Sequence, residues 1–167
     1  MSRLDLFVSP TGAQFMNRRF ACTIGRGGMT DAKREGDGAT PRGVHKIVGM
    51  LYRADRIAAS ALPDWALPIR MGDLWSDDSN DPDYNTMVSA PHPYSHESLR
   101  RADPLYDLIL ITDWNWPYAT AGRGSAIFLH RWRKPCHPTA GCVGFAPADL
   151  LWIANRLQPQ SRLITRG

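Results

Sequence analysis

The chain has 167 residues, the size of one domain, and its 20 basic residues against 16 acidic ones give a net charge of +4. Its 43% hydrophobic content and its 14 Gly and 13 Pro together exclude a disordered tail, a collagen-like repeat and a coiled coil. No apolar run approaches the ~20 residues of a membrane span. The first twenty residues contain no apolar core of a secretory signal. We therefore expect a single domain over residues 1–167 that stays in the compartment where it is made.

The charged residues are mostly of two types: 17 of the 20 basic residues are Arg and 14 of the 16 acidic ones are Asp. Helix-rich proteins favour Glu and Lys, so this choice, with 14 Gly and 13 Pro, favours strands and ordered loops. Arg also binds carboxylates and phosphates through two parallel hydrogen bonds. The three cysteines are an odd number in a chain without an export signal, which disfavours a disulfide framework and makes a free thiol worth seeking.

The predicted elements begin with a strand over residues 4–8, which ends at a Ser-Pro-Thr-Gly turn signal. A second strand is predicted over residues 13–24, where apolar residues recur. Residues 25–43 hold six glycines and predict a long loop, and residues 44–52 then predict another strand.

The second half begins with residues 60–104, which are rich in Pro, Asp, Asn and Ser and lack a periodic apolar pattern. An irregular stretch of this length is unusual as a simple connection, so we interpret it as a functional insertion, a lid or cleft wall. Residues 106–112 and 125–130 are continuously apolar, which predicts strands buried on both faces. A helix is predicted from Ala146 to Leu157 and a short strand over residues 162–165. The chain is therefore expected to be mainly β with one C-terminal helix.

A candidate reactive thiol lies in the last third of the chain. The predicted strand that ends at His130 is followed by a loop and then by Gly141 and Cys142, which we place just before the helix. A thiol at a helix N-terminus beside an imidazole is suited to nucleophilic chemistry, because both features favour the thiolate. Gly141 allows close approach of the backbone, whose amides would stabilise an oxyanion. The pattern thus predicts cysteine-based acyl transfer.

Two segments together resemble the L,D-transpeptidase family, the YkuD-like catalytic domain of peptidoglycan enzymes. Residues 33–43 (KREGDGATPRG) are similar to the family's K-x-G-D-x-x-T-P-x-G loop, with one residue of difference at its start. His130, followed by residues 138–143 (PTAGCV), resembles the family's His and S/T-x-G-C motif. The similarity covers roughly residues 30–157, and the combination is far more specific than either motif alone.

The resemblance implies a β-sandwich-like catalytic domain in which Cys142 is the nucleophile and His130 its general base and acid. The backbone carbonyl of Arg131 would hold the imidazole ring. The substrate would be a peptidoglycan stem peptide, cleaved before its terminal D-amino acid through a thioester, with no metal or organic cofactor. The acyl group would then pass to an amine, as in cross-linking, or to water, as in a cytosolic L,D-carboxypeptidase of peptidoglycan recycling. A non-catalytic peptidoglycan-binding domain is a further alternative.

Two departures from the family pattern limit what is carried over. The interval from His130 to Cys142 is shorter than in the family's long form, Ala140 stands where that form has a second His, and Gly144 replaces a polar residue. Most of these enzymes are exported, whereas this chain shows no signal. We therefore expect a cytoplasmic location, and a periplasmic or cell-wall one if the chain is exported by other means.

Four residues are candidates for substrate binding: Asn115, His96, Arg123 and Thr139. Asn115 follows a buried strand, His96 lies in the insertion, and Arg123 would suit a substrate carboxylate, although a solvated surface position is the simpler interpretation of any one arginine. The loop at residues 36–43 either braces the cleft or is a plain cluster of turns, and it lacks the G-K-[ST] of a phosphate loop.

Other interpretations of the same residues remain open. Cys142 would be a buried structural thiol, or Cys136 and His137 would join it and His130 in a zinc site, although no C-x-x-C pair is present. A disulfide between Cys136 and Cys142 would form only under oxidation. The basic charge and six tryptophans suggest single-stranded nucleic acid, but the basic residues are interleaved with Asp and no RNA-binding motif is present. We therefore expect no nucleic-acid partner and no membrane span; the oligomeric state is left open.

Overall fold

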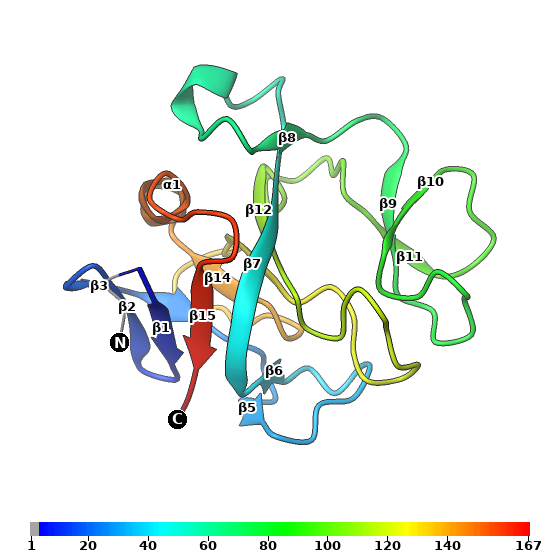
Figure 1. Ribbon diagram of the computed structural model, residues 1–167, viewed down its shortest axis with the longest axis horizontal. Helices are drawn as coiled ribbons and strands as arrows, with labels where there is room; N and C mark the ends of the chain where they lie inside the picture. The colour runs from blue at the N-terminus through cyan, green and yellow to red at the C-terminus, as the bar shows by residue number, and fades with distance from the viewer. Residues whose placement is uncertain (1–3) are drawn as a thin grey trace.

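The structure is a computed structural model that describes residues 4–167. It is mainly β with one α-helix, α1 (Pro147–Ala154), as the composition predicts (Figure 1). The largest sheet has ten strands, and a long strand, β7, lies at its centre. In their order across this sheet the strands are β3 (Arg18–Phe20), β2 (Gly12–Phe15), β1 (Leu6–Ser9), β15 (Arg162–Thr165), β7 (Gly43–Tyr52), β12 (Leu108–Thr112), β13 (Phe128–Arg131), β14 (Val143–Phe145) and β4 (Cys22–Thr23), with β8 (Leu67–Pro68) paired to β7.

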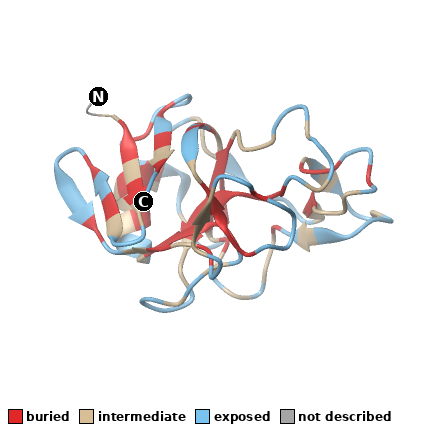
Figure 2. Ribbon diagram, turned by 90° about the horizontal axis from the view of Figure 1, so that it is seen from below, coloured by how far each residue is buried: buried red, intermediate tan, exposed pale blue. Residues whose placement is uncertain are grey.

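Strand β7 joins the two halves of this sheet, since its first half pairs with β15 and its second half with β12. Residues of both halves pack into one hydrophobic core, in keeping with the sandwich-like arrangement that the resemblance implied. Helix α1 packs against β12 and β13. Buried residues gather along the central strands, while most exposed residues lie in turns and loops (Figure 2).

The alternation of side chains along β12 and β13 creates two hydrophobic cores. Leu110 and Leu129 face the core that α1 covers. Ile109 and Phe128 face a second core on the opposite side of the sheet. Both strands are therefore buried on both faces, as their continuous apolar sequences predict. Because residues two apart share a face, His130 is on the same side of β13 as Phe128.

The insertion at residues 60–104 is more regular than we expected. It contains a short 3₁₀ turn at its start, Ala59–Ala61, and a separate three-stranded sheet. Trp75 of this sheet meets Phe128 edge-on, with the two ring centroids 4.9 Å apart, so the insertion closes the second core. The expectation of an irregular segment was wrong here because strands of three or four residues, exposed at many positions, are too short to show a period. These strands are β9 (Asp73–Ser76), β10 (Met87–Ser89) and β11 (His96–Ser98).

The predicted strand over residues 13–24 is also wrong as one element. The chain reverses at Met16 and Asn17, which have positive φ angles of 48° and 64°, so that β2 and β3 form a hairpin and β4 follows separately. The predicted loop over residues 25–43 contains the paired two-residue strands β5 (Met29–Thr30) and β6 (Thr40–Pro41). The strands predicted over residues 44–52 and 162–165 are confirmed.

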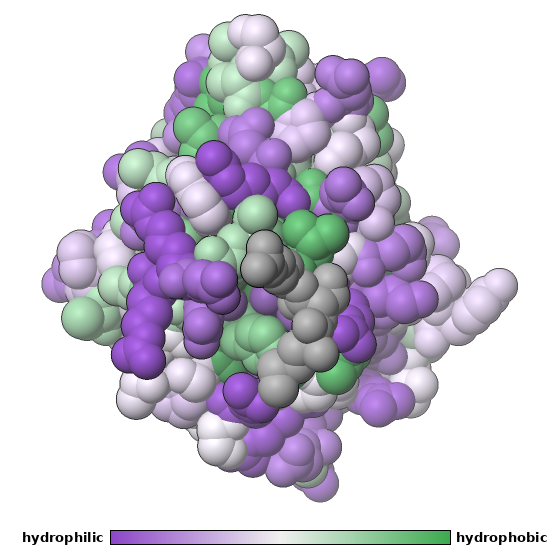
Figure 3. Space-filling view, turned by 60° about the vertical axis from the view of Figure 1, so that its left-hand side comes forward, coloured by the Kyte–Doolittle hydropathy of each residue, from purple (hydrophilic) through white to green (hydrophobic). Residues whose placement is uncertain are grey.

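Hydrophobic residues are concentrated in the two cores. On the face seen in Figure 3, hydrophilic side chains predominate and hydrophobic ones form small groups. Across residues 4–167, no helix has the length and apolar character that crossing a membrane requires.

Candidate active site

Cys142 occupies the position immediately before β14, where that strand runs parallel to β13. Leu129 pairs with Val143, so the thiol of Cys142 lies beside Phe128 at the start of β13. The backbone N–H of Phe128 donates to Sγ over 3.4 Å, and the thiol donates to the carbonyl of Ala126 over 3.0 Å. The side chain is therefore held on both sides by the backbone that leads into β13.

The expectation that Cys142 lies just before the helix was wrong. The sequence Val143–Phe145 forms a strand because it is paired on both sides, with β13 and with β4. Only after this strand does α1 begin, at Pro147. The N-terminus of α1 is therefore not placed to stabilise a thiolate at Cys142. The groups that surround the thiol come from the neighbouring loops and from β13.

Two loops hold the backbone at Cys142. Gly141 has φ +143°, and a Cβ there would lie 3.0 Å from the carbonyl oxygen of Ala39, so the position favours glycine. Thr40 Oγ1 donates to the Gly141 carbonyl over 2.8 Å and accepts from the Gly25 N–H over 2.9 Å. The loop at residues 36–43 thus braces the segment that carries the thiol, which favours that alternative over a plain cluster of turns.

Thr139 gives this segment its local shape. Its Oγ1 donates to the Cys142 carbonyl over 2.6 Å and accepts from the Gly141 N–H over 3.1 Å. Thr139 also lines the pocket described below. The side chain therefore stabilises the turn before the thiol from within the site.

His130 faces the same pocket as Cys142 from the neighbouring strand. Its Nδ1 lies 2.7 Å from the carbonyl oxygen of Arg131, the contact that the resemblance implied. Because a carbonyl only accepts, Nδ1 carries the proton and Nε2 is left as a base. The ring is buried and meets Tyr106 edge-on, with centroids 5.3 Å apart. Burial lowers the pKa of His130 to about 4, against a smaller opposing effect of the Arg131 carbonyl.

The thiol is likewise neutral in this state. Burial first, and then the charge of Glu97, raise the pKa of Cys142 to about 12, while the Phe128 amide and Lys33 act in the opposite direction. A neutral imidazole with an unprotonated Nε2 and a neutral thiol therefore line the same cavity, with no preformed ion pair between them.

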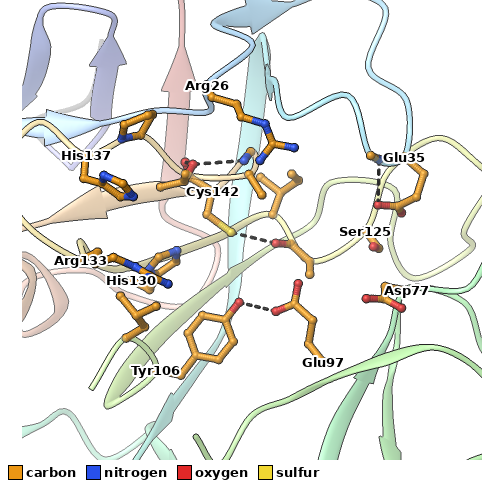
Figure 4. Close-up of a pocket in the computed structure, with 18 of the residues that line it drawn as sticks. Arg26, Glu35, Asp77, Glu97, Tyr106, Ser125, His130, Arg133, His137 and Cys142 are labelled. Carbon is orange, nitrogen blue, oxygen red and sulfur yellow. Dashed lines mark hydrogen bonds between the residues drawn. The ribbon is translucent and has the colours of Figure 1, made fainter. Parts of the chain in front are cut away.

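A cavity of about 360 Å³ opens beside Cys142 and His130 (Figure 4). Its walls come from the loop at residues 33–36, from the insertion, and from the segment between β13 and β14. In Figure 4, Glu35 and Asp77 lie on the right of the view and Arg133 on the left, while Arg26 enters from above. The charged residues that line it are Arg26, Lys33, Glu35, Asp77, Glu97, Arg101 and Arg133.

Three of the four predicted substrate-binding residues do not line this cavity, and only Thr139 does. Asn115 Nδ2 donates to the carbonyls of Thr120 and Gly124, each over 3.0 Å, which shapes its own loop. His96 is exposed, and Arg123 lies over the Trp114 ring at 5.2 Å.

The structure adds pocket residues that sequence reasoning missed. Glu97 is adjacent to His96 on β11, and neighbours on a strand face opposite sides. The alternation of side chains along a strand predicts that His96 and Glu97 face opposite sides, but it does not tell which of the two faces the cavity. Tyr106 and Asp77 carried no local signal.

The zinc interpretation has no geometric support. Within residues 4–167, no three His, Cys, Asp or Glu side chains are grouped closely enough to hold a metal ion. Cys136 is an exposed free thiol and Cys142 a buried one.

The chain is similar in sequence to one known family of domains. The sequence model of the L,D-transpeptidase catalytic domain family, YkuD, matches residues 7–164. No curated protein sequence matches the chain. A solved L,D-transpeptidase from Mycobacterium smegmatis is similar, with a TM-score of 0.45 and 11% identity over 98% of this chain. The chain spans 58% of the length of that structure. Since the family model covers nearly the whole sequence, this chain belongs to the L,D-transpeptidase catalytic domain (YkuD) family.

Proposed function

We propose that this protein is a cysteine-dependent acyltransferase that acts on peptidoglycan stem peptides ending in a D-amino acid. The observation that carries the proposal is the pairing of Cys142 and His130 on one cavity, with His130 Nδ1 fixed by the Arg131 carbonyl. Membership of the L,D-transpeptidase family supports the substrate class. Neither a metal nor an organic cofactor enters the proposed chemistry.

The proposed reaction begins when the substrate carbonyl of the third stem residue reaches Sγ of Cys142. The thiol proton passes to Nε2 of His130 as sulfur attacks, and the imidazolium then protonates the departing nitrogen of the terminal D-amino acid. The C–N bond breaks, a thioester forms on sulfur, and the D-amino acid leaves as an amine. A second attack on the thioester, by an amine or by water, restores the thiol.

The backbone around Gly141 supports the developing oxyanion in this proposal. The N–H of Gly141 donates to Thr139 Oγ1 over 3.1 Å, at the longer end of the ordinary range for such a hydrogen bond. An oxyanion is a stronger acceptor than a hydroxyl, so this amide is suited to turn toward it in the transition state.

The acceptor decides between two outcomes of the same chemistry. Transfer to an amine makes a cross-linking L,D-transpeptidase, and transfer to water makes an L,D-carboxypeptidase. A third outcome, peptide binding without turnover, would make the chain a peptidoglycan-binding domain.

Incubation with a purified stem tetrapeptide, followed by mass spectrometry, tests the proposal and separates these outcomes. Free D-Ala with tripeptide indicates hydrolysis, and D-Ala with a cross-linked dimer indicates transpeptidation. Cys142→Ala is expected to give neither product, with Cys136→Ser, which changes the exposed thiol, as the matched control. Full turnover by Cys142→Ala would refute the mechanism.

A further inference from the structure

We infer that Asn85, a buried residue of the insertion, is a positioning residue for the thiol of Cys142. Asn85 does not line the cavity and acts through Ala126. Its side chain holds the N–H of Ala126, and the carbonyl of Ala126 accepts the hydrogen bond of the thiol. Because this thiol is the nucleophile of the proposed function, the role assigned to Asn85 rests on that function.

The side-chain amide of Asn85 is buried and makes four hydrogen bonds. Its Oδ1 accepts from Nε1 of Trp75 over 3.0 Å and from the N–H of Ala126 over 2.9 Å. Its Nδ2 donates to the carbonyls of Trp114 over 3.0 Å and Asn115 over 2.8 Å. A side-chain amide has two donors and an oxygen with two lone pairs, so all of its capacity is used and its orientation is fixed.

The turn between β9 and β10 directs this amide inward. The N–H of Asn85 donates to the carbonyl of Ser76 over 2.9 Å, and the N–H of Ser76 donates to the carbonyl of Thr86 over 3.0 Å. Asn85 has φ +60°, a left-handed conformation that Asn adopts more readily than most residues. The backbone thus closes the turn, and the side chain reaches the segment that connects β12 to β13.

Ala126 has an unusual backbone conformation just before β13 begins. Its φ is +51°, which is sparsely populated for a residue with a Cβ and persists where the neighbours enforce it. In this conformation its N–H meets Asn85, and its carbonyl oxygen lies 3.0 Å from Sγ of Cys142. The dashed line at the sulfur in Figure 4 marks that second hydrogen bond. The unusual φ of Ala126 therefore aims its carbonyl at the thiol.

The amide of Asn85, and not the thiol, holds Ala126 in this conformation. A thiol is a weak donor and its sulfur a weak acceptor, so the contacts of Sγ with the Ala126 carbonyl and the Phe128 N–H contribute little to holding a strained backbone. The hydrogen bond from the Ala126 N–H to Oδ1 of Asn85 joins two buried amide groups over 2.9 Å and is the stronger interaction. The position of the sulfur therefore follows from Asn85.

A fixed sulfur position matters for attack on the substrate carbonyl. The Ala126 carbonyl and the Phe128 N–H together restrict the Cys142 side chain to one orientation. Without the carbonyl, the sulfur gains other orientations, and a misplacement of about 1 Å can cost about 100-fold in rate. The residues that line the cavity stay the same, so loss of the Asn85 amide should lower kcat and leave KM little changed.

The variant that tests this role in the full chain is Asn85→Gly. Glycine suits the φ of +60°, and the space that opens admits water to the groups that lose the amide. Release of D-Ala from a stem tetrapeptide should show kcat reduced about 10- to 100-fold. Raman difference spectra against Cys142→Ala isolate the S–H stretch of Cys142. The stretch should have the lower frequency of a hydrogen-bonded thiol in the wild type and should rise in Asn85→Gly.

Two control variants separate positioning from stability, which urea unfolding measures for each. Asn85→Asp still accepts from Ala126 but loses the amide donors to the two carbonyls after β12, so the fold should weaken while most of kcat and the S–H stretch are kept. Trp75→Phe is the matched control, because it removes the other hydrogen bond to the same oxygen of Asn85. It should destabilise the fold without moving the S–H stretch.

An S–H stretch typical of a free thiol in the wild type, or one that stays unchanged in Asn85→Gly, overturns the inference. A loss of kcat in Trp75→Phe as large as that in Asn85→Gly overturns it too, since the effect then follows stability alone. If Asn85→Gly does not fold, Asn85→Ser takes its place with the same deciding outcomes, because its hydroxyl is one bond too short to reach the Ala126 N–H.

Failure of this role and failure of the proposed function give different results. If the wild type turns over the peptide through Cys142 and Asn85→Gly does so equally well, the proposed function stands and the positioning role is refuted. If the wild type releases no D-amino acid, the proposed function has failed. The S–H stretch, which needs no turnover, then still decides whether Asn85 orients the thiol.

Discussion

The hydroxyl of Thr40 donates a hydrogen bond to the carbonyl of Gly141 over 2.8 Å, joining two loops 101 residues apart in the chain. The same oxygen accepts a hydrogen bond from the Gly25 N–H. Thr40 is fully buried, so no water replaces these partners if the hydroxyl is removed. The loop at residues 36–43 is thereby a support for the backbone of the candidate nucleophile.

Thr40→Val should therefore destabilise the fold and slow turnover together. The change keeps the side-chain shape but leaves the Gly141 carbonyl and the Gly25 N–H unsatisfied, at a cost of about 1–3 kcal/mol for a buried group. Chemical denaturation measures the loss, and Thr40→Ser, which retains the hydroxyl, is the control. Equal stability of the Val and Ser variants would show that the hydrogen bonds contribute nothing.

Gly141→Ala should impair turnover because of its backbone conformation. The residue has φ +143°, and the new Cβ would lie 3.0 Å from the Ala39 carbonyl, so the segment before Cys142 must shift. Gly36→Ala is the comparison, because its φ of +74° is also positive but nothing lies within 4 Å of its added Cβ. Steady-state release of D-Ala should fall much more in Gly141→Ala, whereas equal effects would mean that the crowding at Ala39 is unimportant.

The stability of the protein should fall with acid as a result of His130. Its pKa is about 4 when folded and 6.5 in a free chain. Between these values the unfolded chain binds a proton that the folded protein does not, so stability is present above pH 6.5 and is lost as the pH falls toward 4. The full effect is about 3 kcal/mol.

Urea unfolding at several pH values checks this prediction. His130→Gln should show a shallower decline between pH 6.5 and 4 than the wild type, because the titrating group is gone. Parallel declines in the two proteins would indicate that His130 is protonated equally in both states.

The strong strands and the helix were predictable from the sequence, since their signals are local. Continuous apolar runs predicted the two-faced burial of β12 and β13, and Pro147 marked the start of α1. That Cys142 and His130 line one cavity was predictable from two motifs taken together. These elements depend on patterns that a few neighbouring residues specify.

The remainder depends on contacts between distant segments. Whether Val143–Phe145 is the end of a loop or a strand is decided by its neighbours β13 and β4, which lie elsewhere in the sequence. The acidic side of the cavity is formed when the insertion packs on Phe128 through Trp75, and no local pattern reports that contact. Sequence reasoning therefore selected His96, which is exposed, in place of the neighbouring Glu97.

The central claim is that an acyl group passes through the sulfur of Cys142. Rapid acid quenching during incubation with a stem tetrapeptide, followed by intact-mass and peptide-level mass spectrometry, tests it most directly. The account predicts a transient adduct with the mass of the acyl tripeptide, located on Cys142 and absent from Cys142→Ala. Release of D-Ala by Cys142→Ala, or an adduct on Cys136 or Cys22 in place of Cys142, would contradict it.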